Sequence, residues 1–296
     1  MLTRRIILLS AALLLSVSAA PAQEKLKAVA TFSILADFVK NVGGDRVDVE
    51  ALVGPNSDAH VYQPSPSDAK KLTHAKVIFT NGLGFEGWIA RLIKASGTKA
   101  PMIVTTKGVN LRKSEDGHGH GDADPHAWQS IANAKVYVAN IRDALIAADP
   151  AGRNAYEANA TAYLARLDAL DAEVKAAIAK IPGDRRKIIT THDAFGYFAA
   201  AYGVTFIAPQ GVSTEAEVSA RDVARIITQI RKQKIPAVFL ENITDDRLLK
   251  RIGAESGARI GGTLYSDALT DAKGPAPTYI DMMRYNVKQL AEALMS

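Results

Sequence analysis

The chain has 296 residues, of which 48% are hydrophobic and 23% charged, and its formal net charge is +5. This length fits one large unit or two smaller ones that can each bury a core, and the ordinary composition excludes a wholly disordered chain. The charge is too small, and too little clustered among aromatic residues, to favour a nucleic-acid-binding protein.

The first 22 residues do not read as part of the fold. Arg4 and Arg5 precede an apolar run of 12 residues, Ile6 to Val17, and Ala20-Pro21-Ala22 then offers a cleavage site with small residues. This order predicts a secretory signal peptide over residues 1–22, and the run is too short to span a membrane. Its removal takes away two arginines and no acidic residue, so the net charge falls from +5 to +3.

The chain contains no cysteine. An exported protein of this kind relies on its hydrophobic core rather than on disulfides. A bacterial lipoprotein also needs a cysteine after its signal segment to carry the lipid. We therefore expect a soluble protein that is not lipid-anchored, and a small diffusible protein of this kind is most useful in the periplasm.

After the signal peptide, short β-rich runs alternate with helical patterns. The expected strands are 26–31, 47–53, 77–80 and 102–105, and the expected helices between them are 34–42, 67–75 and 86–95. A second series has expected strands at 187–191, 204–208, 237–241 and 259–264, and expected helices at 194–202, 215–234, 245–256 and 277–295. Such alternation predicts parallel sheets covered by helices.

A long helical region separates the two series. Residues 133–148 form one expected helix, and 151–181 form a second, with apolar residues spaced by three and four from Tyr156 to Ile178. At 1.5 Å per residue the second helix is roughly 45 Å long, enough to lie along two lobes. The fold class is therefore α/β, with lobes at 23–150 and 183–296 joined by a long helix at 151–182.

Four side chains occupy the ends of expected strands or the start of a helix. His60 lies in a turn-rich loop after the second strand, His192 directly after a strand, Asp267 just past the last strand, and His126 before the helix at 133–148. In open α/β sheets the ligand crevice lies at the carboxyl ends of the strands. We expect the four side chains to meet between the lobes.

The other histidines have weaker interpretations. His74 lies in a helical run and is expected to be structural or exposed. His118 and His120 lie in the Gly-rich, charged segment 113–124, which is either an auxiliary loop that gathers metal or a solvated linker. Three acids could orient the imidazoles, because ligating histidines usually donate their second N–H to a carboxylate or carbonyl; these acids are Asp58, Asp193 and Glu241. Glu241 could instead simply pair with a base.

These residues carry a resemblance to a known family. The segments 54–63, 124–128, 191–198 and 265–269, together with the long helix, resemble the ZnuA/TroA metal-binding receptors of ABC transporters for zinc and manganese. The resemblance implies two lobes joined by a rigid helix, with metal ligands at His60, His126, His192 and Asp267. It also implies a membrane permease as the partner, with a metallochaperone as a further one, and no nucleic acid.

The donor set favours zinc as the transported ion, with Mn²⁺ as the alternative. Three imidazoles and one carboxylate suit Zn²⁺, which prefers four ligands in a tetrahedron, whereas manganese prefers more oxygen ligands. Manganese-selective members of the family carry a glutamate where this chain has His192. We expect zinc affinity to fall in acid as imidazoles protonate near a pKa of about 6.5.

Two other functions compete with import. A periplasmic zinc chaperone or buffer would use the same site without docking to a permease. A secreted zinc hydrolase needs an open coordination position for water, which four protein ligands would remove. The chain also lacks a His-Glu-x-x-His motif and a Gly-x-Ser-x-Gly elbow. We therefore expect a monomeric binding protein and no enzymatic activity.

Overall fold

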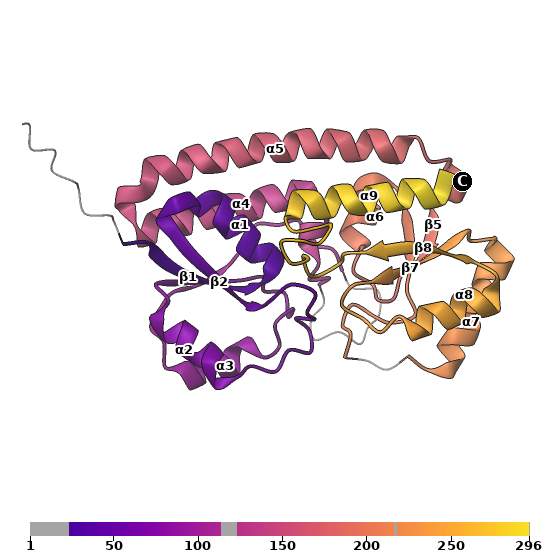
Figure 1. The fold of residues 1–296 in the computed structure, drawn as a ribbon, viewed down its shortest axis with the longest axis horizontal. Helices are drawn as coiled ribbons and strands as arrows, with labels where there is room; N and C mark the ends of the chain where they lie inside the picture. Colours follow the sequence, from indigo (N-terminus) through magenta and orange to yellow (C-terminus); the bar gives the residue numbers. More distant parts are fainter. Residues whose placement is uncertain (1–23, 114–122, 216–217, 296) are drawn as a thin grey trace, which may run out of the picture.

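The computed structural model describes residues 24–113, 123–215 and 218–295. The expected signal peptide, His118 and His120 lie outside the described residues. Two four-stranded sheets lie side by side, with the long helix α5 (Arg153–Ala179) running along both of them (Figure 1). This arrangement confirms the predicted α/β class with two lobes.

Every pair of neighbouring strands is parallel, as the alternating pattern predicted. The first sheet has the order β2-β1-β3-β4 and the second has the order β6-β5-β7-β8, so the two sheets share one topology. The strands are β1 (Leu26–Phe32), β2 (Val47–Val53), β3 (Val77–Thr80), β4 (Met102–Val104), β5 (Lys187–Ile189), β6 (Thr205–Ile207), β7 (Ala237–Glu241) and β8 (Arg259–Leu264).

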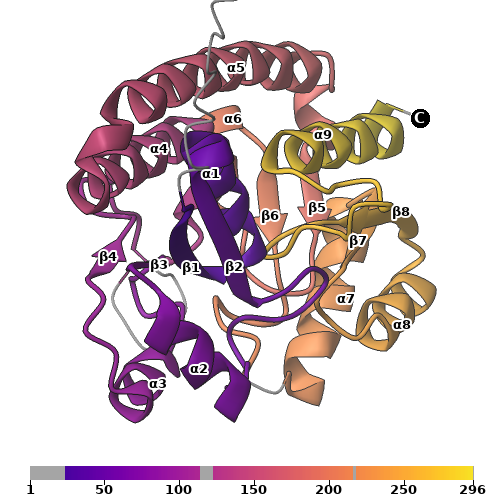
Figure 2. The same cartoon turned by 60° about the vertical axis from the view of Figure 1, so that its left-hand side comes forward.

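Helices cover both faces of the sheets. Figures 1 and 2 show α1, α4, α5, α6 and α9 on one side and α2, α3, α7 and α8 on the other. Their bounds are α1 (Ser33–Gly43), α2 (Pro66–His74), α3 (Ile89–Ser96), α4 (Ile131–Ala148), α5 (Arg153–Ala179), α6 (Gly196–Tyr202), α7 (Ala220–Gln233), α8 (Arg247–Ser256) and α9 (Tyr279–Met295).

Two helices begin three or more residues later than the sequence pattern predicted. α3 begins at Ile89 rather than at residue 86, because Gly82, Leu83 and Gly84 have φ values of 85°, 57° and 79° and form a turn in the left-handed region. α7 begins at Ala220 rather than at residue 215. The Ser219 side chain caps its first turn by accepting a hydrogen bond from the Asp222 N–H.

A pair of long helices connects the lobes. α5 has 27 residues and is therefore about 40 Å long. α9 packs against α5 and β8, and its first residue also reaches the first lobe. There the Tyr279 N–H donates to Asp37 Oδ2 of α1 at 3.0 Å, and the Tyr279 hydroxyl donates to the Trp128 carbonyl at 2.7 Å. The sequence had placed this helix only in the second series.

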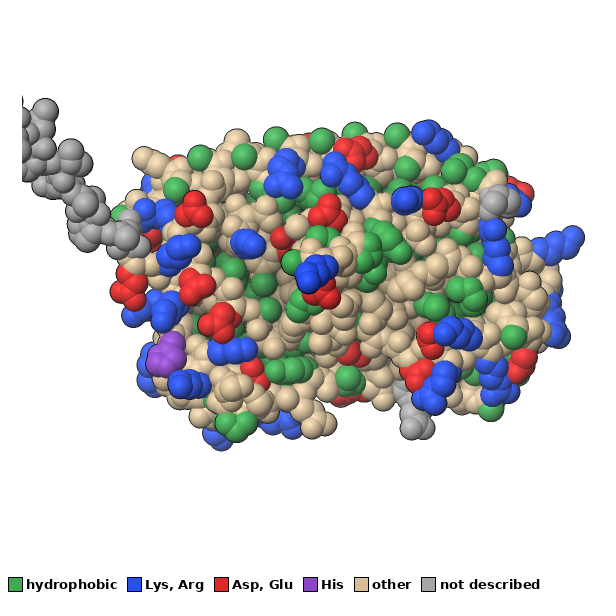
Figure 3. All heavy atoms as spheres, in the orientation of Figure 1, with side chains coloured by type: hydrophobic (Ala, Val, Ile, Leu, Met, Phe, Trp, Pro, Cys, Tyr) green, Lys and Arg blue, Asp and Glu red, His purple; other side chains and the backbone are tan. Residues whose placement is uncertain are grey.

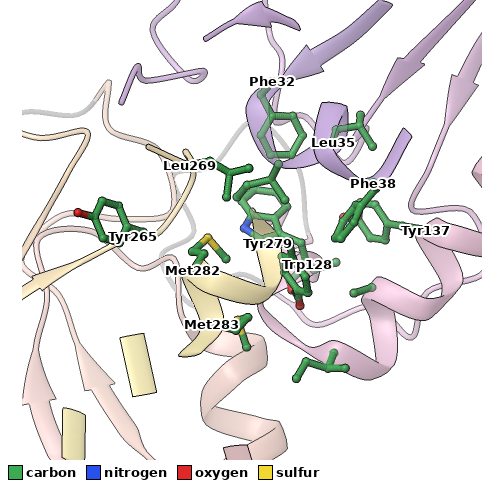
Figure 4. Packing of buried hydrophobic residues seen from close by; sticks show 14 of the residues in the cluster. Phe32, Leu35, Phe38, Trp128, Tyr137, Tyr265, Leu269, Tyr279, Met282 and Met283 are labelled. Atoms are coloured by element: carbon green, nitrogen blue, oxygen red, sulfur yellow. Dashed lines mark hydrogen bonds between the residues drawn. The ribbon is translucent and has the colours of Figure 1, made fainter. Parts of the chain in front are cut away.

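One hydrophobic core runs across the junction of the lobes. Figure 4 shows Tyr279, Met282 and Met283 of α9 packed into the same cluster as Phe32 and Phe38 of the first lobe. The rings of Phe38 and Tyr279 are 4.7 Å apart in an edge-to-face arrangement. Because this core is shared, relative motion of the lobes must repack it, which favours small movements around the cleft.

The surface carries both signs of charge. On the face in Figure 3, the described basic and acidic side chains are interspersed, so neither sign forms a continuous patch there. Among the described residues, no helix combines the length and the apolar character needed to cross a bilayer.

Candidate metal centre

Four side chains from both lobes converge at the cleft. His60 lies in the loop after β2, and His126 directly precedes the 3₁₀ turn Ala127–Gln129 that leads into α4. His192 follows β5, and Asp267 follows β8. One ligand atom from each of the four lies within 4.8 Å of the other three. The structure thus brings together all four residues singled out in the sequence.

The separations of these atoms fit a small cation. Asp267 Oδ2 lies 3.1 Å from His60 Nε2, 3.1 Å from His192 Nε2 and 3.6 Å from His126 Nε2. The Nε2 atoms of His60 and His126 are 3.2 Å apart. Bonds of 2.0–2.1 Å in a tetrahedron separate the ligands by roughly 3.3 Å, so these four distances need little change to hold an ion.

The site is almost closed to solvent. His126, His192 and Asp267 are fully buried, and His60 retains 7% of its surface. A cleft of about 860 Å³ opens over His60, between Tyr62 and Trp88 of the first lobe and Val212 and Ser213 of the second. An ion therefore reaches the four ligands past His60.

Two of the imidazoles are held by buried carboxylates. His126 Nδ1 lies 2.9 Å from Asp124 Oδ1, and His192 Nδ1 lies 2.6 Å from Glu241 Oε2. Glu241 also accepts hydrogen bonds from the backbone N–H groups of Thr191 and His192 through Oε1. A carboxylate on Nδ1 leaves Nε2 facing the site, which is the arrangement that ligating histidines usually have.

The three imidazoles of the site have shifted pKa values. Burial alone opposes a charge on His126, but Asp267 and Asp124 outweigh it and raise the pKa of His126 to about 9. Burial also opposes a charge on His192, yet Glu241 and Asp267 raise its pKa well above the usual range. Burial lowers the pKa of His60. Both shifts favour the charged form of His126 and His192 beside the Asp267 carboxylate.

Asp267 carries the clearest sign of a missing partner. Burial opposes its ionisation, but His126 and His192 hold the pKa of its carboxyl well below the usual range. Its second oxygen, Oδ1, is buried and has no hydrogen-bond partner within the described residues. Since a buried, unpartnered carboxylate oxygen is costly, the site fits a cation better than it fits protons alone.

The candidate orienting acids have different outcomes. Glu241 contacts an imidazole as predicted. Asp58 instead binds the backbone N–H of His60 through Oδ1 at 2.8 Å, and the Asp193 backbone N–H donates to the Gly211 carbonyl. Asp124 was not predicted, although its position two residues before His126 was a usable signal. His74 is exposed on α2, as expected.

The Glu241→Gln variant is expected to bind metal about 10- to 100-fold more weakly than wild type. Glutamine can still accept backbone N–H bonds but cannot place a carboxylate on His192 Nδ1, so the imidazole loses its fixed orientation. Competition titration with a chromophoric chelator measures this change. Glu255→Gln, on the exposed surface of α8, is the matched control, and equal affinities of the two variants would contradict the role of Glu241.

The chain is similar to known metal-binding proteins over almost its whole length. Iron-binding protein YfeA of Yersinia pestis is 36% identical over 285 residues, covering 96% of this chain and 91% of that protein. A manganese ABC transporter substrate-binding lipoprotein, PsaA of Streptococcus anginosus, is 34% identical over 277 residues, which cover 92% of this chain and 90% of PsaA.

Solved structures share the whole fold. The periplasmic zinc-binding protein TroA of Treponema pallidum superposes with a TM-score of 0.86 at 31% identity, covering 91% of this chain and 99% of that one. A manganese-bound periplasmic metal-binding protein of Candidatus Liberibacter asiaticus gives a TM-score of 0.81 at 32% identity, and the match covers 91% of this chain and 100% of that one.

The fold and the site therefore define a periplasmic, metal-binding substrate-binding protein of an ABC transporter. The model of the family described as zinc-uptake complex component A, periplasmic, matches residues 28–293. The chain belongs to this ZnuA family.

Proposed function

We propose that this protein binds Zn²⁺ through His60, His126, His192 and Asp267 and delivers it to the membrane permease of an ABC importer. The observation that supports this most directly is the convergence of the four ligand atoms, from both lobes, within 4.8 Å. Four protein ligands fill a tetrahedral site, so no coordination position remains for the activated water of a hydrolase. The ion is thus held as cargo.

Zinc is proposed on the chemistry of the donors. Three imidazole nitrogens and one carboxylate oxygen match the ligands that Zn²⁺ prefers, while Mn²⁺ prefers oxygen-rich sites of higher coordination number. The names of the relatives include iron, manganese and zinc, so the ion carried by this chain is the point to be tested. Affinity alone does not decide it, because most such sites bind zinc more tightly than manganese in vitro.

The deciding experiment measures uptake by cells. Deletion of the gene is expected to slow uptake of isotopically labelled zinc and to impair growth under zinc chelation, with recovery on expression of the wild-type chain. A chain carrying His192→Ala should fail to restore uptake, whereas one carrying His74→Ala, a substitution on the exposed surface of α2, should restore it. Loss of manganese uptake instead would assign Mn²⁺ as the cargo.

The chaperone or buffer function makes a different prediction. In that case deletion leaves the uptake rates of both ions unchanged and alters only the metal content of other periplasmic proteins.

Several streptococcal relatives are named lipoproteins, and release of this chain as a free, monomeric protein stays a prediction. Fractionation of cells and sedimentation of the purified chain test those two points.

A further inference from the structure

His60 is held differently from the other two imidazoles. His126 and His192 each have a buried carboxylate on Nδ1. In the described part of the chain, the side chain of His60 instead contacts only the other ligands and aromatic rings, with the Phe85 ring centroid 4.7 Å away. What fixes the position of His60 is the backbone of its loop, through the hydrogen bond from its N–H to Asp58 Oδ1.

The loop that carries His60 is tied to the opposite lobe. The Asn56 N–H donates to the Leu269 carbonyl at 2.9 Å, and the Asn242 side chain donates to Asn56 Oδ1 at 3.1 Å. Closest to His60, the Thr214 hydroxyl donates to Asp58 Oδ2 at 2.6 Å. Asp58 therefore uses one oxygen to hold His60 and the other to hold the second lobe.

We propose that the Asp58–Thr214 hydrogen bond is a positioning contact that slows release of the metal. His60 is the ligand nearest to solvent, so release begins when its imidazole moves away from the ion. That movement requires the loop to leave the second lobe, because Asp58 couples the two. The bond crosses between the lobes beside the cleft, which is lined by Val212 and Ser213, next to Thr214.

The coupling acts on release more than on capture. An ion can bind first to His126, His192 and Asp267, since both imidazoles have a buried carboxylate on Nδ1, and His60 then completes the site. Losing the Thr214 hydroxyl leaves this first step unchanged and weakens only the closed state. Asp58 and Thr214 are thus positioning residues, because neither contacts the ion.

The test separates the rates of metal binding and release, and it rests on the proposed metal site. Zinc release from the full mature chain is measured by stopped-flow transfer to a chromophoric chelator in excess, and binding is measured in a separate experiment. Thr214→Val, which removes the hydroxyl and keeps the shape, is expected to release zinc about 2- to 10-fold faster than wild type. Its binding rate should stay within about twofold.

Three further measurements make the result specific. Thr214→Ser keeps the hydroxyl and should release zinc at the wild-type rate. Thr228→Val removes a hydroxyl that bonds only within α7 and is the matched control. The melting temperature of the metal-free Thr214→Val protein should equal that of wild type, since the contact concerns one loop.

Two results would overturn the proposal of a positioning contact, and a third would refute the zinc site itself. Release from Thr214→Val at the rate of Thr228→Val would overturn the proposal, and so would a fall in melting temperature with equal changes in both rates. Failure of the wild-type chain to bind zinc at all would refute the proposed zinc site instead, so the two hypotheses fail in distinguishable ways.

Discussion

Replacing Asp267 by asparagine is expected to weaken zinc binding by about 100- to 1000-fold. Structural zinc sites contribute about 10–16 kcal/mol through four ligands, so one ligand accounts for roughly 2.5–4 kcal/mol. Among the residues that the structure describes, Asp267 is the only carboxylate whose oxygen lies within 3.6 Å of all three Nε2 atoms, so its removal takes the negative charge from the centre of the site.

The measurement is a competition titration against a chelator of known affinity, beside metal analysis of the purified variant. Asp184→Asn, an exposed position in the second lobe, is the control. Asparagine has nearly the same shape as aspartate, so a loss of affinity reports charge and coordination rather than packing. If Asp267→Asn kept wild-type affinity, the negative charge would not be needed for binding. If Asp267→Ala also kept it, the site would have three protein ligands and an open position, and the hydrolase function would have to be tested by assay.

The second large effect is on the pH dependence of metal binding. His126 and His192 have raised pKa values in the metal-free protein, and that of His126 is about 9. Since only neutral imidazole binds metal, each imidazolium must lose its proton when the ion enters. Apparent affinity therefore rises with pH from about 6 to 8 by roughly tenfold per unit for each proton released, and the contribution of His126 levels off above about 9.

This corrects the expectation drawn from the sequence, which placed the loss of affinity near pH 6.5. Unperturbed imidazoles are mostly neutral at pH 7.5 and release almost no proton, whereas the buried pair should release close to two. Titration calorimetry in two buffers with different heats of ionisation counts these protons. Glu241→Gln should release fewer, because His192 loses an anionic partner. Release of no proton by the wild-type chain at pH 7.5 would show that both imidazoles are already neutral.

The sequence predicted the fold well where one rule governed each segment. The eight strands and nine helices in the described part of the chain were predicted because apolar runs and spacings of three and four report directly on burial. The ends were less accurate where a turn intervened. The left-handed residues from Gly82 to Gly84 delay α3, and the Ser219 cap delays α7, because local turn chemistry overrides the hydrophobic pattern there.

The sequence predicted where the four ligands lie but not which acid contacts which histidine. Strand ends meet at one edge of a parallel sheet, so His60, His192 and Asp267 could be expected to converge. The sequence does not state which acid faces which nitrogen. Asp58 and Asp124 stand at the same spacing, two residues before a histidine, and each binds the backbone N–H of that histidine. Only Asp124 also reaches the imidazole, whereas the other oxygen of Asp58 accepts from the Thr214 hydroxyl.

The placement of Tyr279 has a consequence for the order in which the chain can fold. The residue lies 17 positions from the C-terminus, yet its backbone N–H donates to Asp37 and its ring packs on Phe38, both in α1. The core of the first lobe is therefore completed only when residues more than 240 positions apart meet. Because contacts between residues so distant in the sequence slow folding, we expect this part of the core to close late, after α9 has reached the first lobe.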